Sequence, residues 1–160
     1  MKTKSSDPIA QLMQEHNEAL DQLKILNKAS RHFTVKGYSS KPFKQILGAL
    51  RFIEKEVKEH NRKEEDALFP ILERYVEGPT RVMRNDHKKL MHGFEELRSA
   101  VQRVNANRDS FSAIRKMTTT STRIVQLFVN HIHKENYILF PLVQRLLGKE
   151  ELREIAKRML

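Results

Sequence analysis

The sequence predicts an all-α protein, an antiparallel up-down four-helix bundle built from two helical hairpins, with a short helix at the C-terminal end. Three observations favour this fold. Glycine and proline are scarce, with five of each in 160 residues, and they divide the chain into helix-length segments. Apolar residues within these segments recur at alternating intervals of three and four, which is the spacing of a helix with one buried face. The pattern of the first half of the chain also returns 71 residues later.

The first hairpin is expected to join helices over residues 8–34 and 42–73. Pro8 suits the first turn of the first helix, and the serines at positions 39 and 40 suit the N-cap of the second. The expected inward faces are Ile9, Leu12, Met13, His16, Leu20 and Leu23 on the first helix and Phe43, Ile46, Leu50, Ile53, Val57, His60, Glu64, Ala67 and Ile71 on the second.

The second hairpin is expected to join helices over residues 79–105 and 110–147, followed by a short helix over 149–159. Pro79 follows Gly78 at the start of the first of these, and Asp109-Ser110 suits the N-cap of the next. The expected inward faces are Met83, His87, Leu90, Phe94, Leu97, Val101 and Val104, then Ile114, Met117, Ser121, Ile124, Phe128, His131, Glu135, Ile138 and Leu142. We expect residues 1–160 to form a single domain with a bundle core over about 7–147.

The composition excludes several classes of protein. The absence of cysteine rules out disulfides, thiolate metal sites and cysteine nucleophiles. Apolar runs are short and residues 1–10 have no apolar stretch, so we expect no membrane span, no secretory signal and a cytoplasmic location. The formal net charge is +10, but basic residues are interleaved with glutamate, which favours solvated helix faces over a nucleic-acid-binding surface.

The internal repeat carries a histidine and carboxylate pattern. The segment HNRKEEDALFP beginning at His60 aligns with HIHKENYILFP beginning at His131, and in the same register His16 aligns with His87. Each hairpin therefore bears one isolated histidine and, 44 residues later, a His-x-x-x-Glu motif. This periodicity indicates two halves related by a pseudo-twofold axis.

Helix geometry brings these residues to one level. About 18 residues lead from His16 to the first interhelical turn and about as many return from it to His60, so both histidines end at similar height. Taken singly, each group is more simply explained as a hydrogen-bonded core residue or an exposed helix pair. Together, buried imidazoles and carboxylates need a compensating charge, which a bound cation supplies. The predicted ligands are His16, His60, Glu64, His87, His131 and Glu135. A nitrogen and carboxylate set without sulfur suits two borderline metal ions bridged by the two glutamates, and iron is the usual occupant of such bundles.

At these residues the chain resembles the hemerythrin-like family, also called the HHE cation-binding domain. The resemblance covers about residues 7–146, and it includes the Leu-Phe-Pro that follows each motif at 68–70 and 139–141. It implies two Fe ions (Fe²⁺/Fe³⁺) with an oxo or hydroxo bridge that bind O2 or NO, and some relatives act in the repair of damaged iron centres.

One position departs from the pattern of oxygen-carrying hemerythrins, which have His-x-x-x-His on the third helix. Here His87 is followed by Met91, and a thioether is a poor ligand for ferric iron. His92 is offset around the helix and aligns with Asp21 in the repeat, so we expect it at the surface. We also expect surface or cap roles for His32 and His133.

Two kinds of role are open to the charged residues next to the predicted ligands. Glu15 and Asp86 each precede a ligand histidine; either they balance the positive N-terminal ends of their helices or they hydrogen-bond to ligands, and we favour the first. Glu65 and Asp66 could also hydrogen-bond to ligands, but we favour solvation. An apolar sleeve around the centre is expected from Met83, Leu90, Met91, Phe94, Ile124, Phe128 and Ile138.

Three functional classes are compatible with this pattern. We predict a non-haem di-iron protein that binds O2 or NO and is redox-reactive in oxidative or nitrosative stress or in iron-centre repair. Whether it is an enzyme, such as a di-iron oxidoreductase or a peroxide- or NO-handling protein, is left open by the sequence. The alternative is a reversible O2 carrier or sensor. An alternative of another class is a metal-free basic helical bundle that binds an acidic partner. The sequence leaves the physiological ligand and the oligomeric state open.

Overall fold

The computed structural model describes residues 7–160, and all regular structure within that range is helical. The all-α prediction is therefore confirmed. Residues 1–6, which belong to the stretch where we expect no secretory signal, lie outside the described residues. Within residues 7–160, no helix combines the length and the apolar character that a membrane crossing requires.

The observed helices follow the predicted ones closely, with ends that shift by one or two residues. Their bounds are α1 Pro8–Lys36, α2 Ser40–Phe52, α3 Lys58–Lys63, α4 Phe69–Leu72, α5 Pro79–Ala106, α6 Phe111–Lys134, α7 Phe140–Leu146 and α8 Lys149–Arg158. Three π-helical segments join some of them without a break, namely η1 Ile53–Val57, η2 Glu64–Leu68 and η3 Glu135–Leu139.

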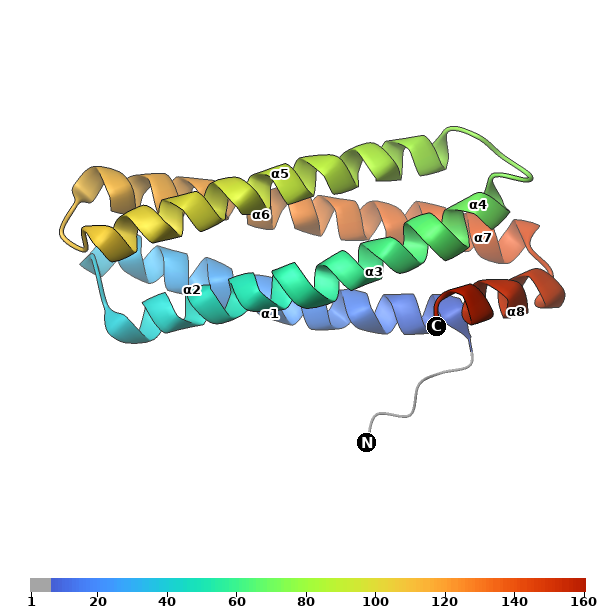
Figure 1. Cartoon of the computed structure of the whole chain (residues 1–160), viewed down its shortest axis with the longest axis horizontal. Coiled ribbons are helices and arrows are strands. Elements are labelled where there is room, and N and C mark those ends of the chain that lie inside the picture. The colour runs from blue at the N-terminus through green and yellow to red at the C-terminus, as the bar shows by residue number, and fades with distance from the viewer. Residues whose placement is uncertain (1–6) are drawn as a thin grey trace.

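The long helical segments lie lengthwise beside one another, as Figure 1 shows. Helix α1 packs on α2 and α6, and α5 packs on α6. Helix α8 folds back at the end of the molecule where α1 begins, and it contacts α1 and η2. The chain thus forms a helical bundle whose interior is reached by side chains from all of its long segments.

Local signals in the sequence explain where these segments begin and end. The side chain of Asp7 accepts a hydrogen bond of 2.9 Å from the Ile9 amide and caps α1. Ser110 caps α6 in the same way, accepting from the Ala113 amide at 3.2 Å. Gly37 and Gly78 adopt φ of 73° and 101° in the turns after α1 and before α5, a conformation that side chains disfavour.

The π-helical segments correct one part of the predicted core. A π turn inserts one extra residue, so the inward face advances by one position after it. Ile138, predicted to line the sleeve, is 61% exposed, and Leu139 is buried in its place. The segments η2 and η3 begin at Glu64 and Glu135, which are repeat-equivalent.

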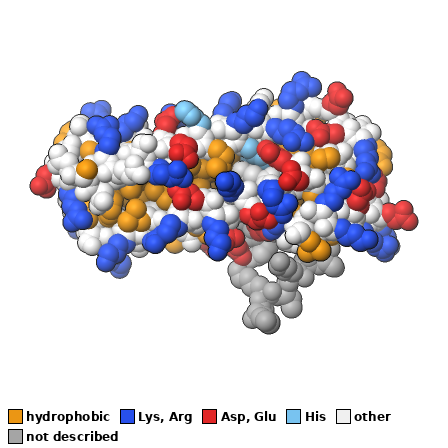
Figure 2. All heavy atoms as spheres, viewed as in Figure 1, with side chains coloured by type: hydrophobic (Ala, Val, Ile, Leu, Met, Phe, Trp, Pro, Cys, Tyr) orange, Lys and Arg blue, Asp and Glu red, His pale blue; other side chains and the backbone are white. Residues whose placement is uncertain are grey.

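Two apolar clusters fill the interior and leave a polar layer between them. The larger cluster spans Ala19 to Phe33 of α1 and the facing parts of α2, η1, α5 and α6. The smaller one is formed by Ile9, Leu12 and Met83 with residues of η2, α4, η3, α7 and α8. On the outer surface, Lys and Arg are interspersed with Asp and Glu over the face seen in Figure 2, as expected for solvated helix faces.

Candidate metal centre

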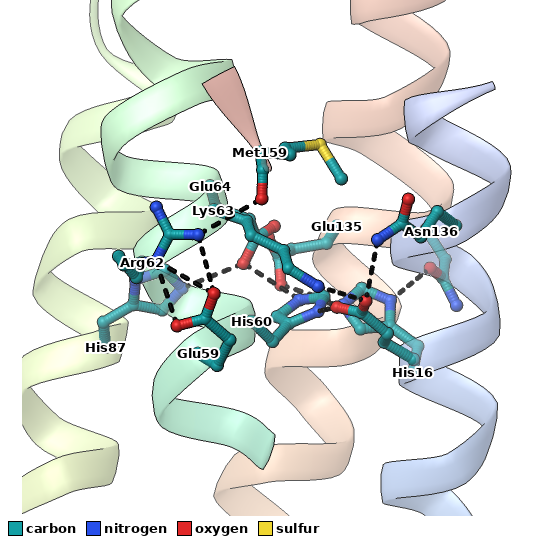
Figure 3. Close-up of polar contacts among 12 residues, drawn as sticks. His16, Glu59, His60, Arg62, Lys63, Glu64, His87, Glu135, Asn136 and Met159 are labelled. Atoms are coloured by element: carbon teal, nitrogen blue, oxygen red, sulfur yellow. Dashed lines mark hydrogen bonds and ion pairs between the residues drawn. The ribbon is translucent and has the colours of Figure 1, made fainter. Parts of the chain in front are cut away.

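All six predicted ligand side chains meet in the polar layer. One histidine comes from each of α1, α3, α5 and α6, and one glutamate begins each of η2 and η3. Figure 3 shows five of them converging from separate helical segments. All are buried, with exposed fractions of 6% or less, and they are His16, His60, Glu64, His87, His131 and Glu135.

These side chains form two overlapping groups of potential metal ligands. Within each group, the ligand atoms lie within 4.8 Å of one another. The first contains His16 and His60, and the second contains His87 and His131. Glu64 and Glu135 belong to both groups. The arrangement provides two neighbouring positions for a cation with two carboxylates common to both.

The facing atoms are close together but poorly satisfied. His131 Nε2 lies 2.8 Å from Glu135 Oε1, and His87 Nε2 lies 3.4 Å from Glu64 Oε1. Despite this proximity, both oxygens of each glutamate and Nε2 of both histidines lack a partner in hydrogen-bond geometry within residues 7–160. Buried acceptors without partners are costly, and a cation between them removes that cost. The donor set fits two ions of the borderline kind, iron included.

The opposite nitrogens of the histidines on the two His-x-x-x-Glu motifs are fixed by carboxylates. His60 donates from Nδ1 to Glu15 Oε1 at 2.9 Å, and His131 donates from Nδ1 to Asp86 Oδ2 at 3.1 Å. The favoured prediction, that Glu15 and Asp86 balance helix ends, was therefore wrong, and the alternative of a hydrogen bond to a ligand histidine is confirmed. Glu15 lies two turns into α1, beyond the first turn in which a helix end acts strongly.

Lysines complete these two outer contacts in a symmetric way. Lys63 donates to Glu15 at 2.8 Å, and Lys134 donates to Asp86 at 2.5 Å. Each carboxylate thus joins a ligand histidine to a partly buried lysine. Such partners fix the tautomer and orientation of a ligand imidazole, so that Nε2 faces the centre.

The two isolated histidines are oriented across the hairpins. His87 donates from Nδ1 to Glu65 Oε1 at 2.8 Å, and His16 donates from Nδ1 to Asn136 Oδ1 at 2.7 Å. For Glu65 the favoured prediction of solvation was wrong and the alternative, a hydrogen bond to a ligand, is confirmed; no role was predicted for Asn136. Their positions differ by 71, the length of the repeat, and that equivalence was the available signal. Asp66 is exposed, as predicted.

The phenylalanine of each Leu-Phe-Pro motif stacks on the isolated histidine of the other hairpin. Phe140 lies 5.3 Å from His16 and Phe69 lies 5.9 Å from His87, measured between ring centroids. Both phenylalanines are fully buried. The motif that follows each His-x-x-x-Glu therefore holds a ligand ring in place from the apolar side.

In the protein without metal, protons are held where cations would bind. Burial disfavours protonation of His60, but the carboxylates of Glu64 and Glu15 outweigh it and raise its pKa to about 10. Burial also disfavours protonation of His131, but the hydrogen bond and the charge of Glu135 outweigh it and raise its pKa to about 9. Burial would raise the pKa of Glu15, yet its hydrogen bonds from His60 and Lys63 lower it to about 2.

The other histidines and Met91 lie outside the two ligand groups. His92 is exposed and pairs with Glu96 at 2.8 Å, and His133 is exposed against Tyr137, as expected. His32 belongs to neither group. Met91 is partly buried and borders a groove of about 500 Å³ together with His87.

Comparison with known proteins agrees with this geometry. The hemerythrin HHE cation-binding domain matches residues 7–143, and the chain belongs to that family. Among curated proteins it is similar to the "Iron-sulfur cluster repair protein YtfE" of Yersinia pseudotuberculosis serotype IB (strain PB1/+), with 27% identity over 137 residues. The protein of the same name from Yersinia pestis (strain Pestoides F) is 26% identical over 137 residues. Each match covers 83% of this chain and 61% of the relative, so the chain spans less than two thirds of these relatives.

Proposed function

We propose that this chain is a non-haem di-iron protein with a carboxylate-bridged centre, and that its helices form the antiparallel up-down four-helix bundle predicted from the sequence. The observation that carries the proposal is the pair of buried ligand groups that share two glutamates whose oxygens lack hydrogen-bond partners among residues 7–160. The proposed ligands are His16, His60, Glu64, His87, His131 and Glu135, with both glutamates bridging.

The residues around the centre would prepare it for a small reactive ligand. Bound iron would supply electron transfer and a coordination position for O2, NO or peroxide. The chain's own part is to hold four imidazoles in fixed tautomers, to offset the cation charge with two buried carboxylates and to exclude bulk water by the apolar clusters on both sides. These features favour chemistry on a small molecule over the binding of a large substrate.

We favour a redox-reactive protein of oxidative or nitrosative stress, or of iron-centre repair, over a reversible oxygen carrier. Met91 stands where the carriers place a further histidine, so the centre has fewer nitrogen donors and more room for exogenous ligands. The name of the relatives, an iron-sulfur cluster repair protein, supports the same direction. The metal-free alternative, a basic bundle that binds an acidic partner, does not explain why the buried oxygens of Glu64 and Glu135 lack hydrogen-bond partners among the described residues.

Elemental analysis with an ultraviolet-visible spectrum tests the proposal. We expect about two iron ions per chain, in keeping with the two ligand groups, and charge-transfer bands that are lost in a His87→Ala variant. His92→Ala, which removes an exposed histidine five residues away, is the matched control and should retain both. A purified protein that takes up no metal would contradict the proposal and favour the metal-free class.

The second step separates the reactive protein from the carrier. The protein is reduced without oxygen and then exposed to O2, NO or peroxide in separate samples. Consumption of the added molecule, or conversion to a ferric state that does not return on deoxygenation, is the expected result. Recovery of the starting spectrum over many cycles of oxygenation would favour the carrier.

A further inference from the structure

Behind the histidines of the two His-x-x-x-Glu motifs, the outer contacts carry the same charges at both metal positions. Behind His60 lie Glu15 and Lys63, and behind His131 lie Asp86 and Lys134. Each pair contributes one carboxylate and one ammonium at the same place in the repeat. These contacts therefore give neither position an advantage in charge.

The contacts behind the isolated histidines are not matched. The acceptor for His87 Nδ1 is the carboxylate of Glu65 at 2.8 Å, whereas the acceptor for His16 Nδ1 is the amide oxygen of Asn136 at 2.7 Å. The two acceptors are repeat-equivalent and make bonds of similar length. The difference between them is a formal negative charge on one side and a neutral group on the other.

We propose that this single difference makes the two metal positions unequal. The inference rests on the proposed function, since it requires that the chain binds two ions. The position of His87 and His131 binds its ion more tightly and fills first, and the position of His16 and His60 holds the more exchangeable ion. A carboxylate acceptor draws on the Nδ1 proton, which makes Nε2 a stronger donor, and it adds a negative charge close to the cation.

The position of His16 and His60 is therefore the one that empties when metal is scarce. Glu65 and Asn136 act through the histidines they orient and are positioning residues, not ligands. Because the two glutamates are shared, the difference in affinity must come from the histidines and from the groups behind them.

The difference in affinity is tested by titrating the metal-free protein with Co²⁺ under anaerobic conditions. Calorimetry and visible absorption monitor the titration. Two binding steps of unequal affinity are expected. His87→Ala should remove the tighter step and His16→Ala the weaker one. Glu65→Gln should weaken the tighter step by about 10- to 100-fold and bring the two steps together. Asn136→Asp should strengthen the weaker step, with a changed spectrum for the second equivalent of Co²⁺.

Asp66→Asn is the matched control, because Asp66 is the next residue after Glu65 and carries the same charge. Its side chain is exposed and pairs with Arg62 at 3.9 Å. It should alter neither step. Equal steps in the wild-type protein, or a Glu65→Gln variant that weakens both steps alike, would overturn the inference while leaving the di-iron proposal standing. A chain that binds no metal would overturn both. If Glu65→Gln fails to fold by circular dichroism, Asn136→Asp decides, since an unchanged second step in that variant contradicts the inference.

Discussion

Nδ1 of His60 lies 2.9 Å from Oε1 of Glu15, so a hydrogen bond joins α3 to α1 directly behind the nitrogen that faces the centre. Burial disfavours protonation of His60, but Glu64 and Glu15 together raise its pKa to about 10. At neutral pH the metal-free protein therefore carries an imidazolium at a position where a metal ligand must be neutral. Metal and protons compete for the same site.

Metal uptake should release protons. The pKa values of about 10 for His60 and about 9 for His131 mean that both are protonated at pH 7 without metal and deprotonated with it. Because the pKa of His87 is raised as well, we expect at least two protons released on full loading at pH 7, and an affinity that rises with pH toward 9. Calorimetric titration in buffers of different ionisation enthalpy measures the number. A His92→Ala control should release as many, and uptake without proton release would contradict these pKa values.

The metal-free protein should lose stability at alkaline pH. His60 has a folded-state pKa raised from 6.5 to about 10, so its contribution is fully present below pH 6.5 and disappears as the pH rises through 10. The melting temperature of the metal-free protein should fall across this range. The loaded protein, in which the imidazole is already neutral, should change less. Scanning calorimetry at several pH values compares the two proteins. If their melting temperatures changed with pH in parallel, the protonation of His60 in the metal-free protein would be contradicted.

Removing metal should lower the melting temperature at any pH where metal binds. An ion present at 100 times its dissociation constant stabilises the folded state by about 2.7 kcal/mol. For a chain of this size, that amounts to about 5–10 °C per ion. Thermal melts before and after chelation, with metal content checked in each sample, measure the difference. Identical melting temperatures would mean that the ligand groups do not contribute to stability through a bound ion.

Replacing Met91 with histidine should shift the centre toward carrier behaviour. Met91 lies one turn after His87 on α5 and borders the same groove, so an imidazole there adds the donor that oxygen-carrying relatives possess. We expect the wild-type protein to convert irreversibly on exposure to air after reduction, and Met91→His to complete more cycles. Spectra recorded over repeated deoxygenation decide. Reversible cycling of the wild-type protein would show that the missing histidine does not set reactivity.

A second buried polar contact gives a test of the fold that is independent of metal. The Ser30 hydroxyl donates to Oγ of Ser121 at 2.6 Å, inside the larger apolar cluster and between α1 and α6. Ser30→Ala should destabilise the protein by about 1–3 kcal/mol, since Ser121 loses its buried partner. The double variant with Ser121→Ala should be less destabilised than the two single effects added together. Urea unfolding of the four proteins gives the coupling energy, and simple additivity would argue against the contact.

The repeat in the sequence was sufficient to predict which six side chains meet. Two motifs and two isolated histidines at a constant offset of 71 leave few ways to fold a helical chain without bringing them to one level. The glycines and prolines between segments indicated the helix ends to within one or two residues. The bound metal itself remains a prediction, because spacing defines ligands and not their occupant.

The errors have local physical causes. Helical periodicity assumes 3.6 residues per turn, and a π turn such as η3 adds a residue that this count cannot anticipate, which is why Ile138 was placed inside. For Glu15, Asp86 and Glu65 the sequence favours other roles over contact with a ligand histidine, because charged residues beside a ligand usually face solvent. Glu15 and Glu65 instead turn toward histidines on other helices, and only the docked bundle reveals those neighbours.

Glu64 and Glu135 belong to both ligand groups, which affects how the two hairpins are held together. These residues are 71 positions apart, and a cation bound to both would cross-link the two hairpins much as a disulfide closes a loop. The sequence has no cysteine, and unlike a disulfide such a cross-link would open without a reductant. Its strength would follow the free metal concentration, which would make the rigidity of the whole bundle a measure of metal supply.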